Sequence, residues 1–232
     1  LADAERSLQV KVTKKAESDQ RIATEKVEWL LGKLADLTRT EPKPRDSRIF
    51  PMHYAPVMIW EHGRRVVKPM RYHCRPAGKP VFYDSKYPGC YNARRDNLEG
   101  FWKCQFGISH GLMLVSAFYE NVSRYRLEKR ALAPDEKDEN VILEFRPQAG
   151  QDMLVACLWS RWTGNDDEEL LSFAAITDEP KPEVAEAGHD RCIIPIQRQN
   201  IDAWLQPNGD LRASYAILDD RERPYYEHRM AA

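Results

Sequence analysis

Four runs of β-branched and aromatic residues, from residue 111 onward, constrain the fold of this chain more than any other feature. They are "GLMLVSAFYE" (111–120), "VILEFRP" (141–147), "MLVACLW" (153–159) and "LLSFAAIT" (170–177). Such residues favour β-strands. Short loops join the runs, where a doubly wound parallel sheet would need regular helical crossovers. The pattern therefore predicts an α+β fold with a mainly antiparallel sheet.

Helices are expected before and after these strands. Residues 2–38 fit a helical pattern because apolar residues recur on one face: Val27, Leu30, Leu31, Leu34 and Leu37. Pro42 ends this pattern. Asp96 and Gly107 are placed to cap a short helix between them, and residues 197–205 predict a second one.

The chain is expected to form one domain over residues 1–232, since no linker or repeat interrupts the strands. Within it we expect an N-terminal helical segment over about residues 1–41 and a core over about residues 50–210. A turn at His62-Gly63 is expected to join two short strands. The charged tail, residues 219–232, is predicted to be peripheral.

Composition narrows the class of protein. The 35 Lys and Arg residues and 36 Asp and Glu residues give a net charge of −1, so only a local basic patch would indicate nucleic-acid binding. The five cysteines have no C-x-x-C spacing, so we expect no metal site but free thiols in a reducing cytoplasm. No run has the roughly 18 apolar residues of a membrane span. Phosphate-loop and dinucleotide motifs are also missing, so no cofactor is expected.

Glu120 is the last residue of the first apolar run and follows Phe118 and Tyr119. A carboxylate at the end of a strand is ordinarily solvated, and the local sequence favours that interpretation. In a pocket, the two aromatic rings would instead keep Glu120 partly dry and raise its pKa, as an acid/base residue requires.

The segment "AGHDRC" (187–192) places His189 beside Asp190 and Arg191. A loop histidine is most often structural or at the surface. Next to Asp190, however, it could be held in one tautomer and transfer protons. Arg191 could bind a phosphate.

The segment "YNARRDN" (91–97) carries a second candidate set. Asn92 can both donate and accept hydrogen bonds, which suits it to orienting a reacting group. Arg94 and Arg95 precede the helix expected at Asp96, and arginines at a helix N-terminus commonly bind phosphate. The alternative is a capping segment with solvated arginines. Aromatic residues near cations in "FWKCQF" and "LWSRW" either stack on bases or, more commonly, belong to the core.

Together, and in this order, five segments resemble the SOS response-associated peptidase family. They are "YNARRDNLEGFWKCQF", "LMLVSAFYEN", "ACLW", "FAAITDE" and "AGHDRCIIPI" with the following "IDAWL". The resemblance covers roughly residues 56–206. The expected core is then a mainly antiparallel or mixed, bifurcated β-sheet of barrel-like shape, flanked by short helices.

The resemblance implies a covalent chemistry on DNA. Family members use a cysteine that becomes N-terminal when the initiator Met is removed. Its amine forms a Schiff base with the aldehyde of an abasic site in single-stranded DNA, and its thiol then closes a thiazolidine ring. The partner implied here is therefore single-stranded DNA with abasic sites, bound covalently by a cytoplasmic monomer that needs no small-molecule cofactor.

The resemblance also implies a role for each candidate residue. Asn92 would orient the reacting group and Glu120 would act as the acid/base. His189 would assist Schiff-base formation and reversal. Arg94 and Arg191 would bind the DNA backbone phosphates.

The sequence departs from the family in four places, among them Met70-Arg71-Tyr72-His73 where many relatives have Met-Arg-Trp-Gly and Cys192 where relatives commonly have Met. It starts at Leu1 without the N-terminal cysteine, so we expect Met-Cys to precede the residues given. The segment "CRPAGKPVFYDSKYPG" (74–89) replaces a tryptophan-bearing one, which leaves Tyr83 and Tyr87 as candidates for base stacking.

Two other functions stay open. One is a general cysteine peptidase with Cys192 as the nucleophile and His189 as the base. The other is a single-stranded DNA-binding module without enzymatic activity.

Overall fold

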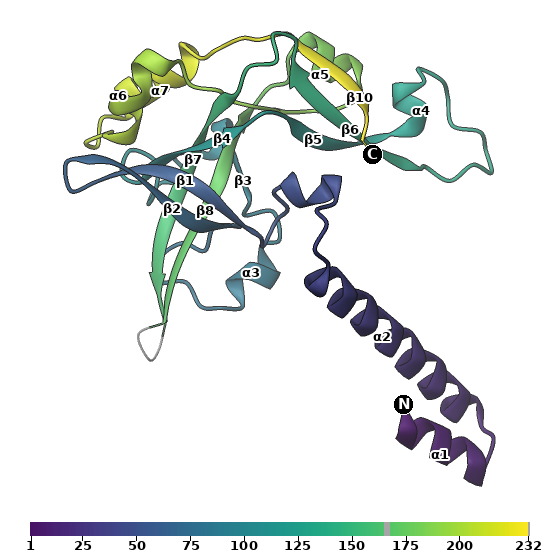
Figure 1. Cartoon of the computed structure of the whole chain (residues 1–232). Coiled ribbons are helices and arrows are strands. Elements are labelled where there is room, and N and C mark those ends of the chain that lie inside the picture. The colour runs from purple at the N-terminus through teal and green to yellow at the C-terminus, as the bar shows by residue number, and fades with distance from the viewer. Residues whose placement is uncertain (165–167, 232) are drawn as a thin grey trace. The chain divides into compact units, whose positions relative to one another are not determined.

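The computed structural model of the protein describes residues 1–164 and 168–231 (Figure 1). The chain groups into two compact units, Leu1–Arg48 and Ile49–Ala232. Two compact units do not by themselves decide between one folding domain and two, so the single domain stays a prediction.

The first unit is helical, as the apolar periodicity predicts. It consists of α1 (Ala2–Val10), α2 (Lys14–Thr38) and a 3₁₀ turn, η1 (Pro44–Ser47). Residues 11–13 separate the two α-helices, and the side-chain oxygen of Thr13 accepts a hydrogen bond from the backbone N–H of Ala16 at 3.1 Å. This N-cap satisfies one of the free donors at the start of α2.

The second unit is built on a closed sheet of five strands (Figure 1). In spatial order they are β2 (Arg64–Tyr72), β1 (Tyr54–Glu61), β4 (His110–Val115), β7 (Met153–Thr163) and β8 (Glu169–Asp178). A parallel pairing between β2 and β8 closes the barrel at Arg71↔Ser172 and Tyr72↔Phe173. The other barrel pairs are antiparallel. The predicted α+β fold with a mixed, barrel-like sheet is confirmed.

Two short strands extend this sheet along β8. They are β3 (Asn92–Arg94), which runs parallel to β8, and β9 (Cys192–Ile193), which runs antiparallel to it. A second antiparallel sheet has the order β10 (Tyr226–Met230), β6 (Asn140–Pro147), β5 (Phe118–Ser123).

Short helices complete the second unit. They are α3 (Tyr83–Lys86), η2 (Arg95–Asn97), α4 (Arg124–Leu127), α5 (Pro182–Glu186), η4 (Arg198–Asn200), α6 (Ile201–Leu205) and α7 (Leu211–Asp219). The helix expected over residues 197–205 is confirmed as η4 followed by α6. No helix in the described part of the chain is long and apolar enough to cross a membrane.

Strands β7 and β8 are buried on both faces, which explains their nearly continuous apolar sequences. In β8, Phe173 and Ala175 belong to one buried cluster, while Ala174 and Ile176 belong to another. The first cluster also contains residues of β5, β6 and β10. The second contains residues of α6 and α7. The barrel wall therefore separates two cores.

The turn expected at His62-Gly63 is confirmed. Both residues have positive φ angles, 53° and 75°, and the pairing Glu61↔Arg64 makes them a two-residue hairpin loop. A type I′ turn requires positive φ at both of its central positions.

The run 111–120 is not one strand but two. β4 ends at Val115, and β5 begins at Phe118 in the other sheet. Glu120 is therefore the third residue of β5 and not a strand end. An apolar run alone does not show where a chain leaves one sheet for another, so the prediction was wrong at this point.

The helix expected between Asp96 and Gly107 is also wrong. After η2 the chain forms successive turns up to Ser109. The Asn97 side chain accepts a hydrogen bond from the backbone N–H of Phe101 at 3.1 Å, and Gly107 has a φ of 80°. Such side-chain bonds to the backbone compete with regular helix.

The tail is not peripheral, because β10 pairs with β6 from Tyr226↔Pro147 to Met230↔Leu143. Tyr226 is only 1% exposed. Helix α7, which was not expected from the sequence, begins after Asp210, whose carboxylate accepts from the N–H of Ala213 at 2.9 Å. Asp210 after an Asn-Gly turn is the N-cap signal that could have revealed it.

Candidate functional site

The site is centred on an ion pair between Glu120 and His189. Glu120 is placed by β5, and His189 lies in the loop between α5 and β9. Their Oε2 and Nε2 atoms are 3.0 Å apart. The side chains are 24% and 10% exposed, so the pair is mostly shielded from water. The two residues are 69 positions apart in sequence, and the fold brings them together.

Both ring nitrogens of His189 face hydrogen-bond acceptors. Nε2 faces the Glu120 carboxylate, and Nδ1 is 3.0 Å from the backbone carbonyl oxygen of Arg191. A neutral imidazole has only one N–H, whereas the imidazolium has two. Burial acts to lower the pKa of His189, but the hydrogen bond and negative charge of Glu120 outweigh it, and the pKa is raised. The geometry thus favours the charged form.

The sequence suggested that Asp190 holds His189 in one tautomer. In the structure the Asp190 carboxylate instead lies near two arginines, Arg94 and Arg191. It is 3.0 Å from Nε of Arg191 and 3.9 Å from Nη1 of Arg94. Burial acts to raise the pKa of Asp190, and the Arg191 guanidinium outweighs it, so the carboxyl stays charged. Arg94 and Arg191 are 41% and 33% exposed at the side chain and have donors for an anion.

The other arginine of this segment is not available. Arg95 pairs with Asp178 at 3.2 Å and with Asp219 at 2.5 Å. It also lies in a 3₁₀ turn of three residues and not at the start of a regular helix. Of these two arginines, Arg94 therefore remains a candidate for phosphate binding and Arg95 does not.

Asn92 and Arg94 lie on the same face of β3, since side chains alternate along a strand. The side-chain oxygen of Asn92 accepts a hydrogen bond from the hydroxyl of Thr177 on β8. This bond fixes the amide orientation. The amide nitrogen of Asn92 is then the group that remains for a ligand.

A family model and several solved structures are similar to this chain. A family model described as "SOS response associated peptidase (SRAP)" matches residues 11–231. The chain belongs to this family. A comparison with curated protein sequences found no match.

Solved structures similar to this SRAP chain share its fold at low identity. A protein from Bordetella bronchiseptica has a TM-score of 0.60 at 17% identity, covering 79% of this chain and 86% of its own. A protein from Bacteroides thetaiotaomicron has a TM-score of 0.61 at 12% identity, with coverage of 80% and 76%. A phage-related protein from Bordetella bronchiseptica has a TM-score of 0.56 at 16% identity, with coverage of 78% and 79%. These identities support the fold alone.

Phe118 and Tyr119 do not act together on Glu120. In the SRAP chain Phe118 is 8% exposed and stacks on Phe145 with 4.9 Å between ring centroids. Side chains alternate along β5, so Tyr119 faces the opposite side from Phe118 and Glu120. Of these two aromatic residues, only Phe118 shares the face of Glu120.

Tyr72 is a site residue that sequence reasoning missed. Burial raises the pKa of its hydroxyl, and the charge of Glu120 adds to this effect. Its ring stacks on Phe173 at 5.0 Å and meets Tyr91 edge-on at 5.6 Å. Tyr72 is thus a neutral wall beside Glu120. The resemblance marked Tyr72 only as standing where many relatives have Trp, and its place beside Glu120 depends on the β2–β8 pairing.

Four of the five cysteines of this SRAP chain are buried, and their pKa values are raised by burial: Cys74, Cys90, Cys157 and Cys192. For Cys192 the pKa rises to about 12. A thiol must ionise to act as a nucleophile, so these cysteines are inert. No cluster of three or more metal-binding side chains occurs in residues 1–164 and 168–231.

The tryptophans of the two aromatic motifs are mostly core residues. Trp102 is 3% exposed and Trp162 is 5% exposed. The indole N–H of Trp162 donates to the backbone carbonyl oxygen of Lys79 at 2.5 Å. Of the two interpretations of these motifs, the core one applies to both residues.

Proposed function

We propose that this protein captures abasic sites in single-stranded DNA as a covalent crosslink through an N-terminal cysteine. The observation that carries the proposal is the pair of Glu120 and His189, 3.0 Å apart, beside two partly exposed arginines. An acid/base pair next to phosphate-binding cations suits carbonyl chemistry on a nucleic-acid strand. Family membership supports the same assignment.

The chemistry needs a proton donor and acceptor at one place. The α-amine adds to the aldehyde carbon of the abasic sugar, and loss of water then gives an imine. The thiol adds to the imine carbon and gives a thiazolidine, with its proton passing to the ring nitrogen. Glu120 would accept the proton that the amine loses on addition, and charged His189 would supply the proton that the departing water needs.

The nucleophile is not among the five cysteines of the sequence. All five are internal, so none has a free α-amine beside its thiol. An α-amine titrates near pH 8, which leaves a useful neutral fraction at pH 7. The proposal therefore requires an N-terminal cysteine on the mature protein, and an intact mass measurement checks for it.

The arginines would hold the strand. The Asp190 carboxylate lies 3.0 Å from Arg191 and 3.9 Å from Arg94, and Arg94 is also 3.4 Å from Asp96. Each guanidinium matches a phosphate with two parallel N–H donors. Contacts of this kind position the strand without reading its sequence.

A crosslinking assay on the full-length protein tests the proposal. The protein is mixed with a single-stranded oligonucleotide that contains one abasic site and is then run on a denaturing gel. We expect a covalent band, which Glu120→Gln slows by about 100-fold, the lower end of general acid/base effects. His189→Ala is expected to slow formation or reversal.

A matched control is Glu61→Gln. Glu61 also forms an ion pair, with Lys68, but lies in β1 outside the site. It should crosslink as fast as the unmodified protein. Absence of a band from protein with a verified N-terminal cysteine would overturn the proposal. A general peptidase that uses Cys192 is disfavoured by its 3% exposure and raised pKa.

A further inference from the structure

A basic and aromatic segment carries Tyr72, Asn92 and Arg94 of the candidate site together with residues that the site does not use. Residues 71–103 hold seven Lys and Arg against three Asp and Glu, a charge of +4 in a chain of −1. Seven of these 33 residues are Phe, Tyr or Trp, about twice the 10% of the whole chain. Aromatic rings mixed with cations are typical of surfaces that bind single-stranded nucleic acid.

The aromatic residues of this segment form one cluster. The ring centroids of Tyr83 and Tyr87 are 4.3 Å apart, and that of Phe101 is 5.7 Å from Tyr87. Trp102, which is buried, packs edge-on against Phe101 with 5.0 Å between ring centroids. Tyr83, Tyr87 and Phe101 are only half-buried, so their rings are in part accessible.

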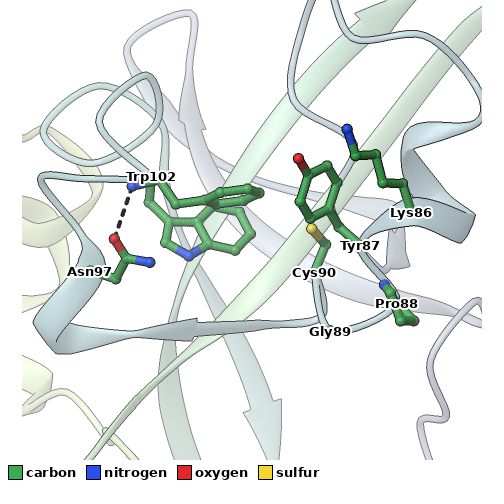
Figure 2. Close-up of a pocket in the computed structure, with 8 residues that line it drawn as sticks. Lys86, Tyr87, Pro88, Gly89, Cys90, Asn97 and Trp102 are labelled. Atoms are coloured by element: carbon green, nitrogen blue, oxygen red, sulfur yellow. Dashed lines mark hydrogen bonds between the residues drawn. The ribbon is translucent and has the colours of Figure 1, made fainter.

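Tyr87, Phe101 and Trp102 of this cluster line a hollow of about 320 Å³ (Figure 2). We call it the aromatic hollow, and its lining includes Lys86, Tyr87, Cys90, Asn97, Phe101 and Trp102. Figure 2 shows Tyr87 on one side and Trp102 on the other. The hollow is too small for a folded partner but has the scale of a small-molecule site, which begins at about 300 Å³.

Two lysines lie beside the tyrosine rings of this cluster. Lys86 lies with its Nζ 5.4 Å from the Tyr87 ring centroid, and Lys79 lies 5.8 Å from that of Tyr83. Both lysines are exposed. Asp84, the acid nearest to Lys86 in sequence, is engaged by Arg71 at 2.8 Å and by Arg75 at 2.5 Å. Asp84 is therefore neutralised, whereas Asp96 and Glu99 lie close in sequence to the lining residues Asn97 and Phe101.

The hollow lies within reach of the candidate site. Cys90 precedes β3 and Asn97 follows it, and β3 is the last strand in the order of its sheet. From Asn92 to Cys90, and from Arg94 to Asn97, the backbone spans at most about 7–10 Å. A stacked strand advances about 3.4 Å per nucleotide. A strand that crosses the edge of β3 would thus reach the hollow in about two to three nucleotides.

We propose that the aromatic hollow is a second DNA subsite, in which a base two to three nucleotides from the abasic site stacks on Tyr87 and Phe101 while Lys79 and Lys86 meet the adjacent phosphates. The inference rests on the proposed function for its ligand class. It assigns the strand a path from Arg94 across the edge of β3. An apolar peptide would fit the rings but would leave both lysines without partners.

Fluorescence anisotropy with a labelled ten-nucleotide oligodeoxythymidine that has no abasic site tests the subsite. Stacking on an aromatic side chain contributes roughly 1–3 kcal/mol per base, so Tyr87→Leu with Phe101→Leu should weaken binding at least tenfold at fixed salt. Lys79→Gln with Lys86→Gln should reduce the slope of log K against log salt by about 1.4, which is about 0.7 for each phosphate that a lysine no longer neutralises. The lysine pair keeps the test valid if the aromatic pair does not fold.

The controls are Tyr225→Leu and Lys137→Gln, an exposed tyrosine and an exposed lysine outside the segment, which should bind as the unmodified protein does. Unchanged affinity in the aromatic pair and an unchanged salt slope in the lysine pair would overturn the subsite. The crosslinking assay separates this outcome from the proposed function. If the protein crosslinks abasic DNA but the variants bind the oligonucleotide as the unmodified protein does, the proposed function stands and the subsite is wrong. If the protein does not crosslink but the variants bind the oligonucleotide more weakly, the subsite stands as a noncovalent binding surface and the proposed function is wrong.

Discussion

At the scale of single residues, His189 shows how two opposed effects set the charge of a site. Burial alone would favour neutral imidazole, and the Glu120 carboxylate reverses that preference. The ion pair also fixes the ring, since Nδ1 is bonded to the Arg191 carbonyl. The residue is then both charged and held in one orientation, as a proton donor in a transition state must be.

The pKa of His189 can be tested directly. By NMR titration of its imidazole signals, we expect a pKa above the ordinary value of 6.5 in the unmodified protein. In Glu120→Gln the pKa should fall, because burial remains while the hydrogen bond and charge of Glu120 are absent. Asp190→Asn should lower it less, since Asp190 contributes less than Glu120.

The same shift predicts a pH-dependent stability. A pKa that is raised on folding means that the pair contributes its full stabilisation below pH 6.5 and loses it as the pH rises through the folded-state pKa. Urea unfolding over this window should show the loss in the unmodified protein and not in Glu120→Gln. An imidazole that titrates below 6.5 in the unmodified protein would contradict both expectations.

At the scale of elements, β10 changes how the end of the chain is understood. Its charged sequence suggested a solvated tail, yet the side chain of its first residue, Tyr226, is buried in the core. Tyr226 meets Phe118 edge-on with 5.0 Å between ring centroids, and Phe118 shares β5 with Glu120. Glu144 of β6 pairs with Arg229 of β10 at 3.2 Å. The C-terminal strand therefore supports the sheet that carries Glu120.

Tyr226→Ala should lower the free energy of unfolding by about 3–5 kcal/mol, the range for removal of a buried aromatic ring. The neighbouring Tyr225, 56% exposed, is the matched control, and Tyr225→Ala should change stability by no more than about 0.5 kcal/mol. Urea denaturation of both variants provides the comparison. Equal effects would show that β10 does not hold the sheet.

The elements that sequence predicted correctly are those fixed by local rules. The His62-Gly63 hairpin follows from turn chemistry, and the helical first unit follows from apolar periodicity. The division of residues 111–120 between two sheets and the pairing of β10 depend on partners far away in sequence. No local pattern encodes those partners.

In the candidate site, too, the local sequence missed those features that depend on distant partners. Family motifs named Asn92, Glu120 and His189, but local reasoning coupled His189 to Asp190, its neighbour in sequence. The structure instead pairs His189 with Glu120 and uses Asp190 to link Arg94 with Arg191. Which carboxylate a histidine meets is decided by sheet packing, and that information is not local.

At the scale of the whole molecule, the chain consists of a helical unit and a barrel unit with its own core. A unit that buries its own core is expected to fold without the rest of the chain. Residues 49–232 alone should therefore unfold cooperatively, with a midpoint measurable by circular dichroism. Loss of cooperative unfolding would instead support one folding domain over residues 1–232.

The parallel seam between β2 and β8 has a consequence for synthesis of the chain. Arg71 pairs with Ser172 and Tyr72 with Phe173, so the barrel closes between strands about 100 residues apart. Contacts of such long range form late, because a long loop must be closed first. A nascent chain would present β1, β2 and β4 as an open sheet until β8 has left the ribosome. Chaperone dependence should thus peak over this interval, before Tyr72 reaches its place beside Glu120.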